Sequence, residues 1–291
     1  MKTLVVILGP TGVGKTKKTI AIAEQLNVPV INADSRQIYK EIPIGSAAPT
    51  KEEQKAVKHF FVGSHTIHDY YSAAKYESDV MKLLSERFQN SDYALISGGS
   101  MMYIDAVCKG IDDIPTVNET IRELFKRRLA EEGLDALLCE LKKLDSDYYQ
   151  IVDNKNPRRI VHALEICHST GKPYTDFRKG IIKKRPFNII KIGLNRPREE
   201  MYDRINERVL NMIDLGLENE ARDVYPLREL NSLNTVGFKE MFQYFDGNIS
   251  FDEAVRQIQS NTRRYMRKQL TWFNHDDDIT WYHPDDKIII E

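Results

Sequence analysis

The chain has 291 residues, of which 41% are hydrophobic and 29% charged, and its formal net charge at pH 7 is −1. This composition is ordinary for a soluble globular protein with a substantial core, and the near-zero charge argues against a general nucleic-acid binder. No uncharged apolar segment is long enough to span a bilayer, and the N-terminus has no signal-peptide pattern, so we expect a cytoplasmic protein without a membrane partner. The cysteines form no C-x-x-C pair and are expected to be buried, not zinc ligands: Cys108, Cys139 and Cys167.

The N-terminal segment is a P-loop, because residues 9–16 read GPTGVGKT and match G-x-x-x-x-G-K-[ST]. Residues 4–8 predict a buried strand and residues 15–26 a helix, which is the setting that the motif requires. The glycines let successive backbone N–H groups surround a phosphate, Lys15 adds positive charge, and the Thr16 hydroxyl can ligate Mg²⁺. We therefore predict a site for a di- or triphosphate formed by Gly9, Pro10, Thr11, Gly12, Val13, Gly14, Lys15 and Thr16.

The next elements indicate a parallel sheet. Residues 29–34 predict a second strand that ends at Asp34, residues 72–90 a helix, and residues 93–97 a third strand that runs into Gly98-Gly99-Ser100. This alternation predicts an α/β fold with a P-loop NTPase-like parallel sheet core. Because ligands gather at the carboxyl ends of parallel strands, we expect Asp34 to face the P-loop.

The middle of the chain has a helical pattern without strands, with helices predicted at 119–132, 134–144 and 157–170. Strand character returns at 187–194, followed by further predicted elements, namely helices at 197–215, 217–229, 235–246 and 250–273 and a strand at 279–282. The simplest account is an insertion in the α/β core. We predict residues 1–115 as the first part of the core, 116–186 as a helical insertion, and 187–291 as the second, mostly helical part.

Basic residues cluster in two places despite the neutral net charge. Residues 155–185 contain nine Lys or Arg against two acids, and residues 254–275 contain five and no acid. Either these segments bind a polyanion, or they are solvated helix faces whose acids come from elsewhere in the fold.

The chemistry served by the P-loop depends on the acids around it. A P-loop kinase usually has a second apolar strand that ends in an acid of the Mg²⁺ shell, whereas the strand at 93–97 ends in Ser97-Gly98-Gly99. Asp34 is the one acid well placed at a strand end. It is either the metal-shell acid of a kinase or a base that acts on an acceptor, in which case the phosphate in the loop can be a leaving group.

Seven segments carry a resemblance to a known family. They are GPTGVGKT (9–16), DSRQIYKEIPIGSAAPT (34–50), ISGGSMMYIDAVCKGI (96–111), NPRRIVHALEI (156–166), RINERV (204–209), TVGFKEM (235–241) and TRRYMRKQLTWF (262–273). In this order, and over nearly the whole chain, they resemble the bacterial tRNA dimethylallyltransferases. The resemblance implies transfer of the dimethylallyl group of dimethylallyl diphosphate to N6 of the adenine 3′-adjacent to the anticodon in tRNA, with Mg²⁺ and with diphosphate as the leaving group.

The resemblance also implies roles for particular residues. Asp34 is the expected base, Thr16 and the P-loop the diphosphate and Mg²⁺ ligands, and Arg208 the cation on the leaving group. Ser100 stands where the family often has threonine and is expected to contact the substrate nucleotide. Contacts with the tRNA anticodon stem-loop are expected from Asp34, Ser35, Arg36, Gln37, Ser100, Arg122, Arg158, Arg159, Ile160, Val161, His162, Asn234, Thr235, Val236, Gly237, Phe238 and Lys239. The chain is expected to act as a monomer with no metal other than Mg²⁺.

Three other functions stay open at this point. The first is a prenyl transferase that acts on free adenine nucleotides, and the second is a small-molecule P-loop kinase. The third is an RNA-binding module in which the P-loop only senses phosphate. Competition between AMP and an anticodon stem-loop for the prenyl group distinguishes the first from the tRNA enzyme.

Overall fold

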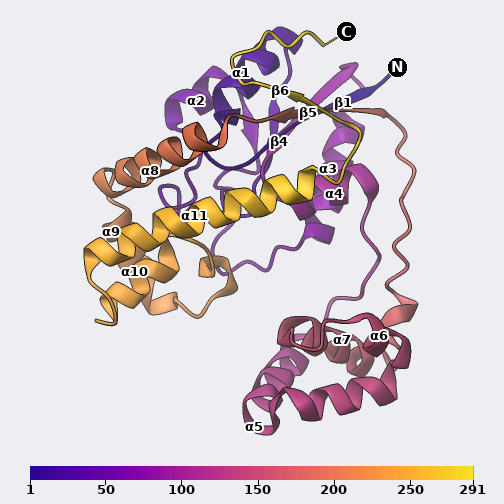
Figure 1. Cartoon of the computed structure of the whole chain (residues 1–291). Helices are drawn as coiled ribbons and strands as arrows, with labels where there is room; N and C mark the ends of the chain where they lie inside the picture. The colour runs from indigo at the N-terminus through magenta and orange to yellow at the C-terminus, as the bar shows by residue number, and fades with distance from the viewer. Residues whose placement is uncertain (291) are drawn as a thin grey trace. The chain divides into compact units, whose positions relative to one another are not determined.

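The structure is a computed structural model that describes residues 1–290 (Figure 1). The chain divides into two compact units: Met1–Lys109 together with the chain from Lys184 onward, and Gly110–Lys183. The second unit lies where the helical insertion was placed at 116–186, with both boundaries a few residues earlier.

The first unit is built on one sheet of six parallel strands in the order β3-β2-β4-β1-β5-β6. The strands are β1 Thr3–Leu8, β2 Val30–Ala33, β3 His59–Phe60, β4 Tyr93–Gly98, β5 Asn188–Leu194 and β6 Ile279–Tyr282. Strand β1 lies between β4 and β5, and all six of its residues are buried. An unbroken apolar strand of this kind is typical of a parallel sheet that is covered on both faces. The predicted α/β class is therefore confirmed.

Successive residues of β1 belong to two hydrophobic cores, one on each face of the sheet. Leu4, Val6 and Leu8 pack into one core, and Val5 and Ile7 into the other, as the two-residue period of a strand requires. The helices of this unit are α1 Lys15–Leu26, α2 Lys51–Ala56, α3 Ala73–Arg87, α4 Met101–Lys109, α8 Arg198–Asp214, α9 Leu217–Val224, α10 Phe238–Phe245 and α11 Phe251–Phe273 (Figure 1).

Most predicted helices form with similar bounds because their ends carry local signals. Helix α11 begins after Ser250, whose side chain accepts the N–H of Glu253, a standard N-cap. The helix predicted at 217–229 is shorter: α9 ends at Val224, and a 3₁₀ turn at Tyr225–Leu227 follows. Its Pro226 has no N–H to continue an α-helix. The short elements α2, β3 and α4 were not predicted.

The helical unit contains α5 Glu119–Leu144, α6 Ser146–Ile151 and α7 Pro157–Thr170. Gly133 interrupts α5 with φ 78° and ψ 174°, so the two helices predicted on either side of it are present as two halves. Helix α6 was not predicted. Its cap, Asp145, is buried: its carboxylate accepts the N–H of Tyr148 at 2.9 Å and the hydroxyl of Thr175 at 2.7 Å. The hydrogen bond from Thr175 joins the start of α6 to the segment that follows α7.

The burial of the cysteines and the length of the apolar helices were both predicted from the sequence. Cys108 and Cys167 are buried as expected, but Cys139 is exposed, so the prediction for Cys139 was wrong. It lies on the solvent side of α5. None of the helices in residues 1–290 is long and apolar enough to cross a bilayer.

Candidate active site

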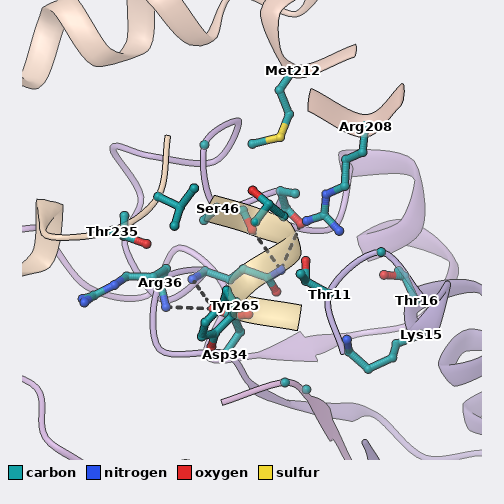
Figure 2. A pocket seen from close by; sticks show the side chains of 18 of the residues that line it. Thr11, Lys15, Thr16, Asp34, Arg36, Ser46, Arg208, Met212, Thr235 and Tyr265 are labelled. Carbon is teal, nitrogen blue, oxygen red and sulfur yellow. Dashed lines mark hydrogen bonds between the residues drawn. The ribbon is translucent and has the colours of Figure 1, made fainter. Parts of the chain in front are cut away.

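A cavity of about 750 Å³ lies at the carboxyl edge of the sheet (Figure 2). Its walls come from the P-loop, the segment after β2, the end of β4, helix α8, the loop before α10 and helix α11. Six of the seven segments that carried the family resemblance therefore meet around one space, although Thr11 and Gln269 in its wall are 258 residues apart in the chain.

The P-loop adopts the conformation that its glycines permit. Gly12 and Gly14 have φ of 84° and 100°, in the left-handed region that favours glycine. A Cβ atom on Gly9 would lie 2.6 Å from the carbonyl oxygen of Leu194, so a larger residue cannot fit there. Gly9, Pro10 and Val13 shape the turn without lining the cavity, whereas Thr11, Gly12, Gly14, Lys15 and Thr16 line it.

Lys15 is held inside the loop by its own backbone. Its Nζ donates to the carbonyl oxygens of Gly9 and Pro10, each at 2.9 Å. Burial and, next, the charge of Arg208 lower the pKa of Lys15 to about 8, although the Asp34 carboxylate acts in the opposite direction. Lys15 is therefore charged at neutral pH but titrates close to it.

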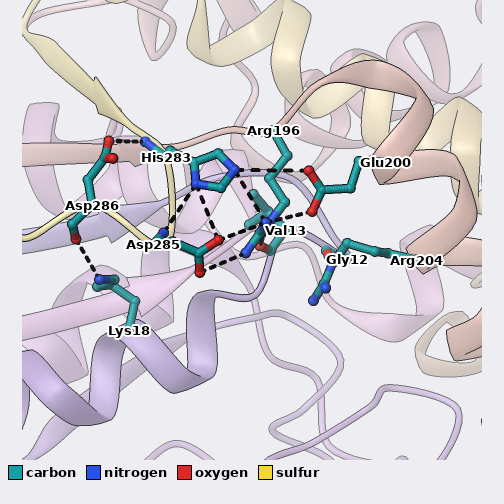
Figure 3. Close-up of polar contacts among 9 residues, drawn as sticks. All are labelled: Gly12, Val13, Lys18, Arg196, Glu200, Arg204, His283, Asp285 and Asp286. Carbon is teal, nitrogen blue, oxygen red and sulfur yellow. Dashed lines mark hydrogen bonds and ion pairs between the residues drawn. The ribbon is translucent and has the colours of Figure 1, made fainter.

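Two arginines bind backbone carbonyls of the P-loop (Figure 3). Arg204 Nε donates to the Gly12 carbonyl at 2.9 Å, and Arg196 Nε donates to the Val13 carbonyl at 3.1 Å. Arg196 is itself fixed by an ion pair to Glu200 at 2.6 Å. Both arginines thus hold backbone carbonyls of the P-loop, and Arg204 also lines the cavity. Arg196 was not predicted as a site residue, because no local motif contains it.

Gln269 of α11 joins the P-loop to the end of β4. Its Oε1 accepts the Thr11 N–H at 2.9 Å, and its Nε2 donates to the Gly99 carbonyl at 2.8 Å. The side chain is 1% exposed. Gln269 was not predicted as a site residue either. The available signal was its spacing, which places Gln269 on the buried side of α11 with Ile258 and Met266.

Asp34 follows β2 directly and is oriented by its own loop. Its Oδ1 accepts the N–H groups of Arg36 at 2.9 Å and Gln37 at 3.3 Å, the local pattern of an Asx turn. Its Oδ2 receives no hydrogen bond from any group in residues 1–290. One oxygen therefore fixes the carboxylate and the other is available to a ligand.

Arg208 extends from α8 toward the same space (Figure 2). Burial lowers its pKa, and the Asp34 charge opposes that shift. Arg208 makes no ion pair with a carboxylate in the part of the chain that the structure describes. Two cations, Lys15 and Arg208, thus share a partly desolvated cavity, and this arrangement favours an anionic ligand.

The acids and possible metal ligands around the cavity are few. Asp34 and Glu207 are the acids among its lining residues, and the end of β4 contributes Ser97, Gly98 and Gly99. Within residues 1–290, no cluster of three His, Cys, Asp or Glu side chains could hold a metal by itself. A Mg²⁺ ion near the Thr16 hydroxyl would therefore take most of its ligands from a bound phosphate and water, as Mg²⁺ commonly does.

The residues predicted to contact the nucleotide separate into two groups. Those that line the cavity are Asp34, Ser35, Arg36, Gln37, Asn234, Thr235, Val236 and Lys239. Ser100 lies outside it: its hydroxyl accepts the Ser35 N–H at 2.8 Å and donates to the Ser35 hydroxyl at 3.2 Å. Ser100 thus supports Ser35. Gly237 is buried and adopts φ 101° at the start of α10. Phe238 is fully buried and packs against Gly45, so its side chain belongs to the core and is not expected to contact tRNA.

The remaining predicted tRNA contacts lie in the helical unit. Arg158 and Arg159 are exposed in the first turn of α7, and the His162 side chain is half-exposed, 3.6 Å from Glu165. Ile160 is fully buried in the core of this unit, and Val161 packs partly against that core. Their side chains stabilise α7 and are not expected to contact tRNA. Arg122 is half-buried on α5.

Comparison with known proteins identifies relatives over nearly the whole chain. The family model described as IPP transferase matches residues 37–276. The chain is 58% identical over 283 residues to tRNA dimethylallyltransferase 1 of Phocaeicola vulgatus, covering 97% of this chain and 94% of that protein. It is 41% identical to tRNA dimethylallyltransferase of Cytophaga hutchinsonii, covering 97% and 93%.

Solved structures agree with this assignment. The full-length tRNA isopentenylpyrophosphate transferase of Bacillus halodurans is 34% identical, with a TM-score of 0.70, covering 98% of this chain and 90% of that one. A eukaryotic dimethylallyltransferase acting on tRNA shares the fold with a TM-score of 0.81 at 23% identity, covering 98% and 75%. On these matches, the chain belongs to the IPP transferase family, which includes the tRNA dimethylallyltransferases.

Proposed function

We propose that this protein transfers the dimethylallyl group of dimethylallyl diphosphate to N6 of the adenine 3′-adjacent to the anticodon in tRNA. The observation that carries this proposal is that one cavity contains both an anion site and a base. The P-loop, Lys15 and Arg208 form the anion site, and Asp34 has one carboxylate oxygen available to a ligand. The absence of an acid among the β4 residues that line the cavity argues against a kinase. The names of the relatives support tRNA as the acceptor.

The donor half of the reaction needs a stabilised leaving group. The bond between the allylic carbon and the diphosphate oxygen breaks, and that oxygen takes both bonding electrons. Lys15, Arg208 and the backbone N–H groups of the P-loop would bind the negative charge that develops there. A partly desolvated cavity strengthens these interactions relative to water.

The acceptor half needs a base. The adenine amine is a weak nucleophile because its lone pair is delocalised into the ring, and it carries an excess proton once the new C–N bond forms. In this proposal Asp34 accepts that proton on Oδ2, while Oδ1 remains bound to the N–H groups of Arg36 and Gln37. Proton removal by a positioned carboxylate typically accelerates such a step about 10²-fold to 10⁴-fold.

We propose Mg²⁺ as the cofactor, held by the Thr16 hydroxyl and by diphosphate oxygens. When bound, the ion neutralises part of the diphosphate charge. The small number of carboxylates around the cavity fits a metal that arrives with its substrate. This predicts that the protein without donor binds Mg²⁺ weakly.

The helical unit is the proposed binding surface for the stem of the tRNA. Its α7 presents Arg158 and Arg159 to solvent in its first turn, and the exposed guanidinium groups suit phosphate oxygens. The adenine has to leave its stack to reach a carboxylate at the sheet edge, as it does in other enzymes that act on a base.

The direct test is incubation of the protein with dimethylallyl diphosphate, Mg²⁺ and unmodified tRNA, followed by mass analysis of the nucleosides. We expect one dimethylallyl mass on a single adenosine, and with Asp34→Asn a rate of product formation that is about 10²-fold to 10⁴-fold lower. An equimolar mixture of AMP and anticodon stem-loop separates the alternatives, because a tRNA enzyme labels the stem-loop. Wild-type protein that labels no adenosine in any stem-loop would exclude the proposed function.

A further inference from the structure

One aromatic side chain in the cavity has no role in the reaction described above. Apart from the imidazole of His59, the cavity lining within the described chain contains a single aromatic ring, that of Tyr265. Its side chain is 37% exposed. An aromatic ring left partly uncovered inside a binding cavity is a candidate contact for a planar ligand.

The position of Tyr265 is set by helix α11. Ile258, Thr262, Tyr265 and Gln269 all line the cavity and follow the i, i+4, i+7, i+11 spacing of one helix face. Gln269, one turn beyond Tyr265, is bound to Thr11 and Gly99 at 2.9 and 2.8 Å. The ring is therefore held on the cavity wall at a fixed position relative to the P-loop.

Tyr265 lies beside the proposed base (Figure 2). Burial and, next, the charge of Asp34 raise the pKa of Tyr265 to about 12, with Arg36 acting in the opposite direction. The hydroxyl is therefore neutral at physiological pH. It makes no hydrogen bond to any group in residues 1–290, so this tyrosine is not committed to the fold through its polar end.

We infer that Tyr265 forms the stacking face of the acceptor subsite, so that the adenine ring lies against the Tyr265 ring while N6 points to Asp34. This inference rests on the proposed function. A base that leaves the anticodon loop loses its neighbours, and enzymes that extrude a base replace that stacking with aromatic or apolar side chains. The contact also selects a flat heteroaromatic acceptor and limits the directions from which N6 can approach the allylic carbon.

Two substitutions of Tyr265 distinguish a role of its aromatic ring from a role of its hydroxyl. Stacking needs only the aromatic face, so Tyr265→Phe should keep kcat/KM for an anticodon stem-loop within about 3-fold, whereas Tyr265→Leu should lower it. Since stacking of a base on an aromatic side chain contributes substantially to binding free energy, we expect kcat/KM to fall about 5-fold to 100-fold in Tyr265→Leu. The KM for dimethylallyl diphosphate should stay unchanged in both variants, because Tyr265 is not part of the P-loop.

The test combines kinetics with a spectroscopic readout. A stem-loop with 2-aminopurine at the acceptor position reports stacking directly, because a stacked neighbour quenches its fluorescence. We expect dim complexes with the wild-type and Tyr265→Phe proteins and a brighter complex with Tyr265→Leu at saturating protein. Tyr70→Leu is the matched control, since Tyr70 is 57% exposed and does not line the cavity.

Two results would overturn the inference. One is a Tyr265→Leu protein whose kcat/KM for the stem-loop and 2-aminopurine fluorescence both equal those of the wild-type protein. The other is a Tyr265→Phe protein as impaired as Tyr265→Leu, which would assign the role to the hydroxyl. Failure of the wild-type protein to prenylate any stem-loop contradicts the proposed function itself, so the two failures are distinguishable.

Discussion

The buried amide of Gln269 offers a quantitative test of how helix α11 supports the P-loop. Gln269→Leu removes the acceptor of the Thr11 N–H and the donor to the Gly99 carbonyl. A buried polar group without a partner costs about 1–3 kcal/mol. Both residues line the cavity, but Gly99 is buried and should bear most of the cost, whereas Thr11 is partly exposed, so water can replace part of its lost bond. We therefore expect the free energy of unfolding to fall by about 2–4 kcal/mol.

The same substitution should weaken donor binding. Freeing Thr11 leaves a P-loop residue that must be ordered when the diphosphate binds, and fixing the backbone of one residue costs about 1–2 kcal/mol. The KM for dimethylallyl diphosphate should then rise about 5-fold to 30-fold. Steady-state prenylation at saturating stem-loop measures this value, and urea unfolding measures the stability.

The matched control lies on the same helix. Within residues 1–290 the Gln257 side chain hydrogen-bonds only to the Glu253 side chain, one turn away. Gln257→Leu should therefore change stability by less than about 0.5 kcal/mol and leave the donor KM unchanged. A Gln269→Leu protein with wild-type stability and wild-type donor KM would refute the reasoning. It would mean that neither hydrogen bond constrains the loop.

Four further predictions follow from the site. Asp34→Asn should lower kcat about 10²-fold to 10⁴-fold with tRNA affinity little changed; normal turnover with a large loss of affinity would contradict the role as base. Since the pKa of Lys15 is lowered to about 8, its charge is lost as pH rises through that value. The kcat/KM for the donor should then decline above pH 8, and Lys15→Arg should move the decline to higher pH; an identical profile would exclude Lys15 as its origin. Arg196→Met removes the bond to the Val13 carbonyl at 3.1 Å and should raise the donor KM several-fold without changing the KM for tRNA; a change in the KM for tRNA alone would contradict it. Charge reversal at Arg158 and Arg159 should reduce the slope of log K against log salt by about one unit for each lost phosphate contact, and an unchanged slope would place them outside the tRNA interface.

Helix ends and the P-loop were predictable because their signals are local. The GPTGVGKT sequence requires a strand, a glycine turn and a helix, and these form at Thr3–Leu8 and Lys15–Leu26. Ser250 and Asn156 cap α11 and α7 where the sequence analysis began those helices. The elements α2, β3, α4 and α6 were not predicted. Each has fewer than ten residues, which is shorter than the window over which a hydrophobic period is recognised.

A motif does not by itself show which of its residues contact the ligand. Ile160 and Phe238 lie within segments that resemble the family, yet both side chains are fully buried. A segment identified as a whole contains residues that face the ligand and residues that hold the segment in place. On a helix these alternate with a period of 3.6, and only packing decides which face is buried.

The sequence by itself determined the α/β class, the phosphate loop and the position of Asp34 at a strand end, because each depends on residues within a few positions of one another. The tertiary structure alone decided that Arg196, Gln269 and Tyr265 support or line the cavity. Gln269 meets Thr11 across 258 residues of chain, and no local pattern encodes which distant group a side chain will reach. Those contacts arise only when the parallel strands align and α8 and α11 pack beside the P-loop.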